Sequence, residues 1–335
     1  MENKMNNKDK IKKKNNLSNK KNIKSVLAIV GVVLVYILIS FLANGDLLSR
    51  QFKSLIVPVG INVILAVSLS LTVGFLGELS LGHAGFMAIG AYASALFTLN
   101  MDFHEPTRFL LSIIIAGIVA GFFGYLVGVP ALRLRGDYLA IVTLAFNEII
   151  RSLINSFGFT GGALGLSKIP RLSNYTWVFI IVVITILLIH NFVKSRYGRA
   201  IKSIRENYIA AETIGIKVSR YKTMAFVVAA FFAGIAGALY AHNFSIIKPS
   251  DFDYNKSIEI LVIVVLGGMG NIKGSIIAAI VLTILPEALR SVNEYRMLLY
   301  SIVLIVMMLL RSPDLRTKIE TNDKLPKFIK NFGKN

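Results

Sequence analysis

The chain contains no cysteine and only one tryptophan among its 335 residues, and only 16% of its residues are charged. Without cysteine, disulfide bonds, thiolate metal ligands and cysteine nucleophiles are all excluded. Soluble domains average about a quarter charged residues, so this chain is too poor in charge for a typical soluble protein. The low charge accompanies a hydrophobic content of 55%, and together they predict an all-α membrane protein with many spans.

Residues suited to catalysis or metal binding are also sparse. The four histidines, His83, His104, His190 and His242, lie far apart and show no metal-ligand spacing. The glycine-rich stretch Leu266–Ser275 lacks the G-x-x-x-x-G-K-[ST] register of a phosphate-binding loop, and we expect a tight cytoplasmic turn there instead. The sequence therefore predicts no enzyme, no cofactor and no metal site.

Long apolar runs recur along the chain and predict about ten transmembrane helices. Their approximate bounds are 26–43, 54–76, 81–99, 109–130, 138–154, 176–193, 222–243, 256–267, 274–289 and 297–311. The run 256–267 is shorter than the roughly 20 residues that cross a bilayer, so it is expected to be broken or to use its flanks. Eight or nine crossings result if a short run is re-entrant. Pro286 is expected to kink or end the ninth helix.

The formal charge of +19 is concentrated at the chain ends and between the apolar runs. Nine lysines lie within residues 1–24, and seven Lys/Arg residues follow Leu310. Cytoplasm-facing segments have this distribution under the positive-inside rule, whereas a nucleic-acid-binding surface does not. We therefore predict a disordered basic tail at 1–24, a transmembrane domain at 25–311 and a second tail at 312–335, with both termini in the cytoplasm.

Small residues at four-residue spacing occur in two of the predicted helices. Such small-xxx-small pairs allow close approach between helices, and we expect this packing to occur within one subunit. The pairs are Gly117/Gly121, Gly124/Gly128, Ala230/Gly234 and Ala233/Gly237.

One polar interruption, Ser195–Lys222, carries seven Lys/Arg residues and two acids. Apolar or small residues recur in it at spacings of three and four, which predicts a short helix with one apolar face. That face comprises Ile201, Ile204, Tyr208, Ala211 and Gly215, and the opposite face comprises Lys202, Arg205, Glu206, Asn207 and Glu212. Such a helix lies on anionic lipid or docks into a groove of a cytoplasmic partner, and these residues alone leave both alternatives open.

Polar residues also interrupt the apolar runs themselves. Gly77–Tyr92 combines glycine and alanine with Glu78 and His83. It either lines a pathway through the membrane or forms an interfacial turn in which its glycines pack tightly. In the run 138–154, Asn147, Glu148 and Arg151 share a helix face, and we expect Glu148 and Arg151 to pair with each other. After this run, Thr160–Leu166 predicts a compact, flexible loop on the outer side.

Five motifs, in this order, resemble the M-type permease subunit of branched-chain amino-acid ABC transporters. The resemblance covers about residues 26–311 and leaves out both charged tails. The motifs are GELSLGHAGFMAIGAYASAL, RLRGDYLAIVTLAFNEIIR, TGGALGL, GRAIKSIRENYIAAETIGI and VVLGGMGNIKGSIIAAIVL.

The resemblance implies a type II ABC-importer-like permease in a bacterial cytoplasmic membrane. It implies a second, H-type permease subunit, two cytoplasmic ATP-binding subunits and an extracytoplasmic protein that delivers leucine, isoleucine or valine. In such permeases the segment that matches Gly198–Ile216 holds a coupling helix that enters a groove of the ATPase. The residues carried over to this element are Arg205, Glu206, Asn207, Ala210, Ala211 and Gly215.

The resemblance implies no equally firm substrate contacts, and Gly82, His83 and Glu148 are the residues we expect along the pathway. Two alternatives to this function remain. The permease could carry another small solute, such as a different amino acid or urea. A secondary transporter driven by an ion gradient would need buried acids within the membrane, and Glu148 is the one suitable acid.

Overall fold

The computed structural model describes residues 31–41, 50–101, 104–134, 136–289, 301–302 and 305. The chain divides into two compact units, residues 1–56 and 57–335. In the first unit, the described helices are Gly31–Phe41, within the predicted first span, and α2 (Arg50–Ser54). The predicted tails at 1–24 and 312–335, and nearly all of the predicted span 297–311, lie outside the described residues.

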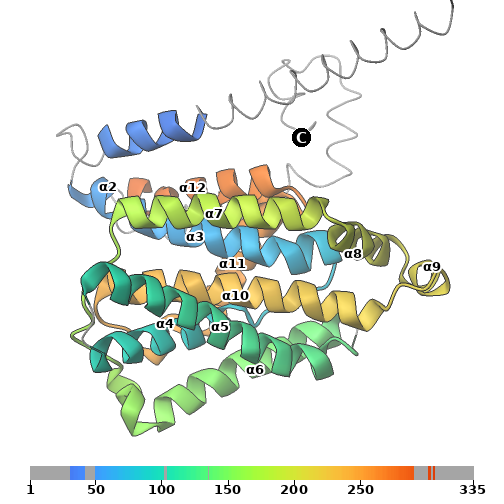
Figure 1. Ribbon diagram of the computed structural model, residues 1–335, viewed down its shortest axis with the longest axis horizontal. Coiled ribbons are helices and arrows are strands. Elements are labelled where there is room, and N and C mark those ends of the chain that lie inside the picture. The colour runs from blue at the N-terminus through green and yellow to red at the C-terminus, as the bar shows by residue number, and fades with distance from the viewer. Residues whose placement is uncertain are drawn as a thin grey trace, which may run out of the picture. The chain divides into compact units, whose positions relative to one another are not determined.

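The second unit is built from helices (Figure 1). Among the described residues, the β-structure consists of one isolated antiparallel bridge between Leu166 and Ile247. The longer helices are α3 (Ile56–Leu69), which continues as the π-helix η1 (Ser70–Leu76), α4 (His83–Asn100), α5 (Glu105–Ala131), α6 (Asp137–Ser156), α7 (Tyr175–Lys194), α10 (Val218–Phe244), α11 (Tyr254–Gly267) and α12 (Ile272–Ala288). Two short helices, α8 (Arg196–Glu206) and α9 (Tyr208–Thr213), connect α7 to α10 and lie at the right of Figure 1.

Five segments of the described chain are long and apolar enough to cross a membrane. They are Gln51–Leu76, Glu105–Ala131, Asp137–Ser156, Tyr175–Lys194 and Val218–Phe244, and each coincides closely with a predicted span. The predicted spans 81–99, 256–267 and 274–289 correspond to α4, α11 and α12, which are shorter or less apolar. The total of ten spans stays a prediction.

The centre of the second unit is α10, which packs against α4 and α5 through small residues. Gly90 of α4 lies against the backbone of Gly234, and Gly124 of α5 lies against Ala230. An added methyl group at either glycine would overlap its neighbour, so these helices approach closely only because both positions lack a side chain. The predicted small-residue packing within one subunit is confirmed for these contacts.

The π-helix η1 brings α3 against the turn between α11 and α12. Its last bond has the geometry of a π-helix, in which the Gly77 N–H donates to the Thr72 carbonyl oxygen five residues earlier. Gly74 in η1 lies directly against the backbone of Gly270, which has a φ of 83° in the turn. Glycine is required at both positions, for close approach at the first and for a left-handed φ at the second. The turn predicted within Leu266–Ser275 is confirmed.

Both α4 and α11 begin inside the bundle instead of at its ends. The first residue of α4, His83, accepts or donates a hydrogen bond of 2.8 Å from Nε2 to Ser68 Oγ. Ser68 precedes the end of η1 by eight residues, so this contact lies well inside the helix and not at its end. The next residue, Ala84, donates its N–H to Ser257 Oγ in the first turn of α11, at 3.0 Å. Residues 77–82, which precede α4, therefore enter the bundle without helical structure, and the segment that precedes α11 enters it through the 3-10 turn η4 (Pro249–Phe252).

Two smaller expectations concern the ends of helices. Pro286 lies inside α12, two residues before the helix ends at Ala288, and the expectation that it kinks or ends this helix stays a prediction. The predicted loop Thr160–Leu166 is compact, because two short 3-10 turns lead into the bridge between Leu166 and Ile247. This loop therefore packs against the segment that enters the bundle ahead of α11.

Candidate functional site

The segment between α7 and α10 forms two helices, so the single helix predicted there is wrong in one respect. Asn207 has an extended backbone, with φ −157° and ψ 104°, and this ends α8. Its side-chain oxygen then accepts hydrogen bonds of 3.1 Å from the N–H groups of Ile209 and Ala210, which starts α9. The predicted apolar face is therefore divided at Asn207. Asparagine favours such N-cap positions, because its side chain bonds to nearby main-chain N–H groups.

The division places some apolar residues inside and others outside. Ile201, Ile204 and Ala211 are buried, as the predicted face requires. In contrast, Ile209 is 58% exposed and Ile214 is 75% exposed at the tip formed by α9. Gly215 has a φ of +87° and no atom near the position of an added Cβ, so it ends α9 through its left-handed backbone. The tip is thus a small, well-formed apolar surface with Glu206, Asn207, Ala210 and Glu212 also exposed around it.

The base of the same segment is attached to the end of η1 by three side chains. Arg205 Nη1 donates a hydrogen bond of 2.6 Å to the Gly74 carbonyl oxygen. The Lys202 ammonium lies 5.4 Å from the centroid of the Phe75 ring, within the range of a cation–π contact. Lys222 in α10 pairs with the Glu78 carboxylate. We call these contacts, between Gly74–Glu78 and Lys202, Arg205 and Lys222, the η1 junction.

The ion pair of the η1 junction is the most buried one described. The side chains of Lys222 and Glu78 are 8% and 13% exposed. Taking two charges out of water is costly, so such a pair is retained only where both partners are held in place. The η1 junction therefore attaches α8 and the start of α10 to the end of η1.

Gly82 and His83, the residues expected along a pathway, are buried in packing between helices. An added Cβ at Gly82 would lie 2.8 Å from the Thr143 carbonyl oxygen of α6. His83 contacts Ser68 of α3, and the N–H of Leu81 donates to Thr143 Oγ1 at 3.0 Å. These contacts hold the non-helical segment before α4 against α3 and α6. A role of Gly82 and His83 in the pathway stays a prediction.

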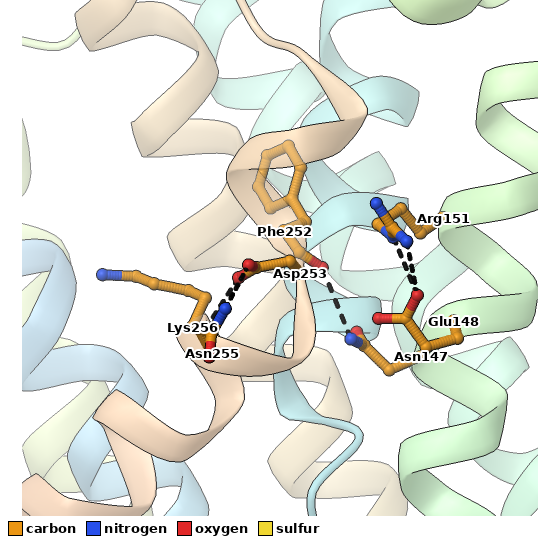
Figure 2. A network of polar contacts seen from close by, with 7 residues as sticks. All are labelled: Asn147, Glu148, Arg151, Phe252, Asp253, Asn255 and Lys256. Atoms are coloured by element: carbon orange, nitrogen blue, oxygen red, sulfur yellow. Dashed lines mark hydrogen bonds and ion pairs between the residues drawn. The ribbon is translucent and has the colours of Figure 1, made fainter.

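Glu148 forms the predicted pair with Arg151, on α6. Arg151 Nε and Nη2 both donate to Glu148 Oε2, at 2.9 and 2.7 Å (Figure 2). One turn earlier, Asn147 is fully buried, and its Nδ2 lies 3.4 Å from the Phe252 carbonyl oxygen. Phe252 ends the 3-10 turn η4 (Pro249–Phe252), which precedes α11. These contacts place polar groups of α6 against the segment that enters the bundle before α11.

Sequence reasoning missed the partners in the η1 junction. The sequence marks Glu78 as a polar residue, but Lys222 and Glu78 are 144 residues apart and no local spacing links them. The predicted single helix has Arg205 on its polar face, whereas the Arg205 side chain reaches inward to the Gly74 carbonyl oxygen. A usable signal did exist, because a lysine and a glutamate at the edges of apolar runs require partners when they are buried.

Other kinds of site find little support in the described part of the chain. Within it, no group of three or more His, Cys, Asp or Glu residues could hold a metal ion. The arrangement instead consists of a long-helix bundle, two helices that begin within it and an exposed two-helix tip.

Comparison with protein families decides the class of the protein. Residues 51–310 match the family described as the branched-chain amino acid transport system / permease component. The chain belongs to this family. It is accordingly a multi-pass membrane protein of a transport system, in agreement with its apolar helices.

Curated relatives include both permease types of one system. The chain is 36% identical to the high-affinity branched-chain amino acid transport system permease protein LivM of Escherichia coli (strain K12), over 83% of this chain and 73% of the relative. It is 26% identical to the permease protein LivH of the same organism, over 75% of this chain and 89% of LivH. The nucleoside ABC transporter permease protein NupC of Lactococcus lactis is 28% identical over 51% of this chain and 62% of NupC. No solved structure matches the chain.

Proposed function

We propose that this protein is the M-type permease subunit of an ATP-driven importer that carries leucine, isoleucine and valine across a bacterial cytoplasmic membrane. The observation that carries the proposal is the 36% identity to LivM over 83% of the chain, against 26% to LivH. An H-type permease subunit completes the pathway, because relatives of both types exist in one organism. An extracytoplasmic binding protein delivers the amino acid.

Two cytoplasmic ATP-binding subunits drive the transport, and the α8–α9 tip enters a groove of one of them. The support is the exposure of Ile209 and Ile214 at the tip, together with the firm attachment of its base at the η1 junction. A helix with exposed apolar residues fits a groove, and lateral attachment to lipid would not require the exposed Glu206 and Glu212. The residues of this coupling element are Arg205, Glu206, Asn207, Ala210, Ala211 and Gly215.

Transport then follows from movement of the ATP-binding subunits. Their closure on ATP displaces the tip, and the η1 junction passes the displacement to α3 and α10, which changes the side of the membrane to which the pathway opens. Gly82, His83 and Glu148 lie near the pathway at the places where α4 and α6 meet. The cytoplasmic side of the protein then holds the α8–α9 tip and both termini. The basic tails at 1–24 and 312–335 also face the cytoplasm, in keeping with the positive-inside rule.

The test is a reconstituted system. The chain is co-purified with the H-type permease and the ATP-binding subunits, placed in proteoliposomes and supplied with the binding protein. We expect leucine uptake that requires ATP and ceases when the ATP-binding subunits are inactivated. Uptake that continues without ATP hydrolysis but collapses with an uncoupler would establish an ion-coupled transporter instead.

The cargo is tested separately, because the relative NupC is named as a nucleoside permease. Uptake of leucine, isoleucine and valine is compared with uptake of uridine, urea and other amino acids, each with its own binding protein. The proposal requires the three branched-chain amino acids to be preferred. If the complex transports only a nucleoside or only urea, the protein is still an ABC permease, but the proposed cargo is wrong.

A further inference from the structure

One side of α6 packs into the bundle and the other side is exposed. The helix is among the five segments that are long and apolar enough to cross a membrane, and it lies at the edge of the second unit in Figure 1. Its remaining surface is partly or fully exposed. The buried residues share the side that faces α4 and η4, and they are Leu139, Ala140, Thr143, Asn147, Ile150 and Ile154.

One part of the exposed surface is an apolar stripe along the whole helix. It comprises Tyr138, Val142, Ile149 and Leu153, which follow one another at spacings of four and seven residues and therefore share a face. Their exposed fractions lie between 37% and 72%. Large apolar side chains exposed on a membrane-spanning helix are suited to contact with lipid tails.

Beside the apolar stripe, the second half of α6 carries a polar stripe. It comprises Glu148, Arg151, Ser152 and Asn155, which follow one another at spacings that keep them on one face. The side chains of Arg151 and Glu148 are 42% and 30% exposed, and Ser152 and Asn155 are exposed as well. Two turns before Glu148 the same face carries Ile141, so the polar stripe belongs to the half of α6 that leads to the outer loop.

The polar stripe cannot face lipid at low cost. With 20 residues, α6 is about 30 Å long, which matches the hydrocarbon thickness of a bilayer. Glu148 lies just past the midpoint of this helix, so both charges of its pair with Arg151 lie at the depth of the lipid tails. Charged side chains at this depth face the interior of a bundle or water, and the polar stripe is exposed on this subunit.

A hollow of about 280 Å³ at the outer end of the polar stripe favours water over a closely packed protein surface. Arg151, Ser152 and Asn155 line it on one side. The other side is formed by Ala163 of the compact loop and by Pro249 and Ser250 of η4. The hollow has room for several water molecules, and most of its lining residues are polar, as a hydrated space requires.

Two other polar atoms of α6 do not belong to the hollow. Asn147 Oδ1 and Glu148 Oε1 are buried and have no hydrogen-bond partner among the described residues. Neither residue lines the hollow, and Asn147 Oδ1 faces the first turn of α4, near Gly85. We therefore assign these two oxygens no contact with a solute.

We propose that the polar stripe of α6 forms part of the wall of the water-filled pathway, and that the apolar stripe beside it faces lipid. This inference rests on the proposed transport function. It adds Arg151, Ser152 and Asn155 to the pathway and gives them a place in its outer half. The ion pair between Arg151 and Glu148 supplies this wall with polar groups while the two charges compensate each other.

The test uses the absence of cysteine from this chain. Ser152→Cys and Leu153→Cys each place one thiol at the same depth, on the polar and the apolar stripe. The complex with its partner subunits is placed in lipid nanodiscs and treated with a charged methanethiosulfonate reagent, and labelling is followed by the mass of this subunit. A thiol among lipid tails stays protonated and unreactive, so we expect Ser152→Cys to react at least about tenfold faster than Leu153→Cys.

A second measurement separates the pathway from other wet surfaces. The labelling rate of Ser152→Cys is compared without nucleotide and with the ATP-binding subunits trapped by ATP and vanadate. A pathway that changes its open side should alter this rate severalfold. Asn100→Cys is the control, because Asn100 is exposed at the outer end of α4 and should be labelled at the same rate in both states. Asn155→Cys replaces Ser152→Cys if that variant does not assemble.

Uptake of leucine by the wild-type complex is measured alongside. A wild type that does not transport leucine would contradict the proposed function, whatever the labelling shows. If uptake is normal, equal labelling of Ser152→Cys and Leu153→Cys would overturn the assignment of the two stripes. Equally slow reactions would mean that lipid or a partner subunit covers both, and equally fast reactions that water surrounds α6. A fast reaction of Ser152→Cys that ignores the nucleotide state would place the polar stripe in water outside the pathway.

Discussion

Arg205 and Gly74 are joined by a hydrogen bond of 2.6 Å from the guanidinium group to a main-chain carbonyl oxygen, across 131 residues of sequence. The carbonyl belongs to η1, the π-helix at the end of α3, and π-helical segments are frequent at functional sites. The same Nη1 atom lies 3.2 Å from the position of an added Cβ at Gly270. One side chain of α8 therefore meets the end of α3 and the α11–α12 turn together.

Replacement of Arg205 is expected to separate ATP hydrolysis from transport. Arg205→Glu should leave membrane insertion and assembly intact, because the residue is at the edge of the bundle, but it removes the donor to Gly74. We expect binding-protein-stimulated ATP hydrolysis to continue while uptake of leucine falls about tenfold, the loss typical of a charged hydrogen bond. The measurement is the ratio of leucine transported to ATP hydrolysed in proteoliposomes.

Arg199 supplies a control with the same change of charge. It is also in α8, but its guanidinium group bonds locally to the Lys194 carbonyl oxygen at 3.2 Å. Arg199→Glu should keep a ratio close to that of the wild type. A ratio lowered equally by both variants would show that the charge of α8 matters and that the bond to Gly74 does not.

Disruption of the Glu78–Lys222 pair is expected to destabilise the protein. Glu78→Gln or Lys222→Met leaves one buried charge without its partner, which costs about 3–5 kcal/mol in comparable pairs. The double variant Glu78→Gln/Lys222→Met removes both charges and should recover most of the loss. Thermal unfolding of the purified protein in detergent measures this. Additive losses in the double variant would contradict an interaction between the two residues.

The exposed tip at α9 is expected to matter for assembly and not for folding. Ile214 is 75% exposed, so Ile214→Asp should leave thermal stability unchanged, while retention of the ATP-binding subunits during purification should fall severalfold. Leu164, which is 86% exposed in the loop after α6, gives the matched control Leu164→Asp, with retention as in the wild type. Full retention with Ile214→Asp would favour a tip that lies on lipid.

Gly215→Trp tests the shape of the same tip. The positive φ of Gly215 is unfavourable for any residue with a side chain, even though the space around it is open. We expect normal insertion into the membrane, together with uptake that is lost or uncoupled from ATP hydrolysis. Normal uptake by both Gly215→Trp and Arg205→Glu would show that the α8–α9 tip does not couple ATP hydrolysis to transport.

Because the segment before α4 is closely packed, we expect an added side chain there to lower the stability of the protein. Gly82→Ala would place a methyl group 2.8 Å from the Thr143 carbonyl oxygen and should cost about 1–3 kcal/mol. Gly158→Ala is the control, because no atom lies within 4 Å of the added methyl group and its φ is not positive. A difference in the midpoint of thermal unfolding checks this. Equal unfolding midpoints for Gly82→Ala and Gly158→Ala would mean that the backbone before α4 shifts to accommodate the methyl group at little cost.

Much of the helical framework could be predicted from the sequence, because lipid-facing helices carry their signal in continuous apolar runs. The predicted run 176–193 and the helix Tyr175–Lys194 agree within a residue at each end. The pairing of Glu148 with Arg151 was also predictable, since the two residues are three apart on one helix. Features of this kind depend on local spacing, which a sequence states directly.

Features that depend on distant partners were not predictable in the same way. The break at Asn207 is a local exception, because a continuous apolar periodicity concealed an N-cap residue within it. The contacts of Arg205 with Gly74 and of Lys222 with Glu78 join segments more than 100 residues apart, and only the folded bundle brings them together. The unused oxygens of Asn147 and Glu148 likewise become visible only when every nearby donor has been placed.

Because α4 and α11 begin inside the bundle, they also affect how many membrane crossings are counted along the chain. Each helix completes a passage that begins outside α-helix, as the coil 77–82 before α4 and as the 3-10 turn η4 before α11, and neither helix is among the long apolar spans. A hydropathy count that omits one of them inverts the assigned side of every later loop. If the count omits both helices, the number of omitted crossings is even. The two chain ends are then assigned to the same sides as in a count that includes both helices.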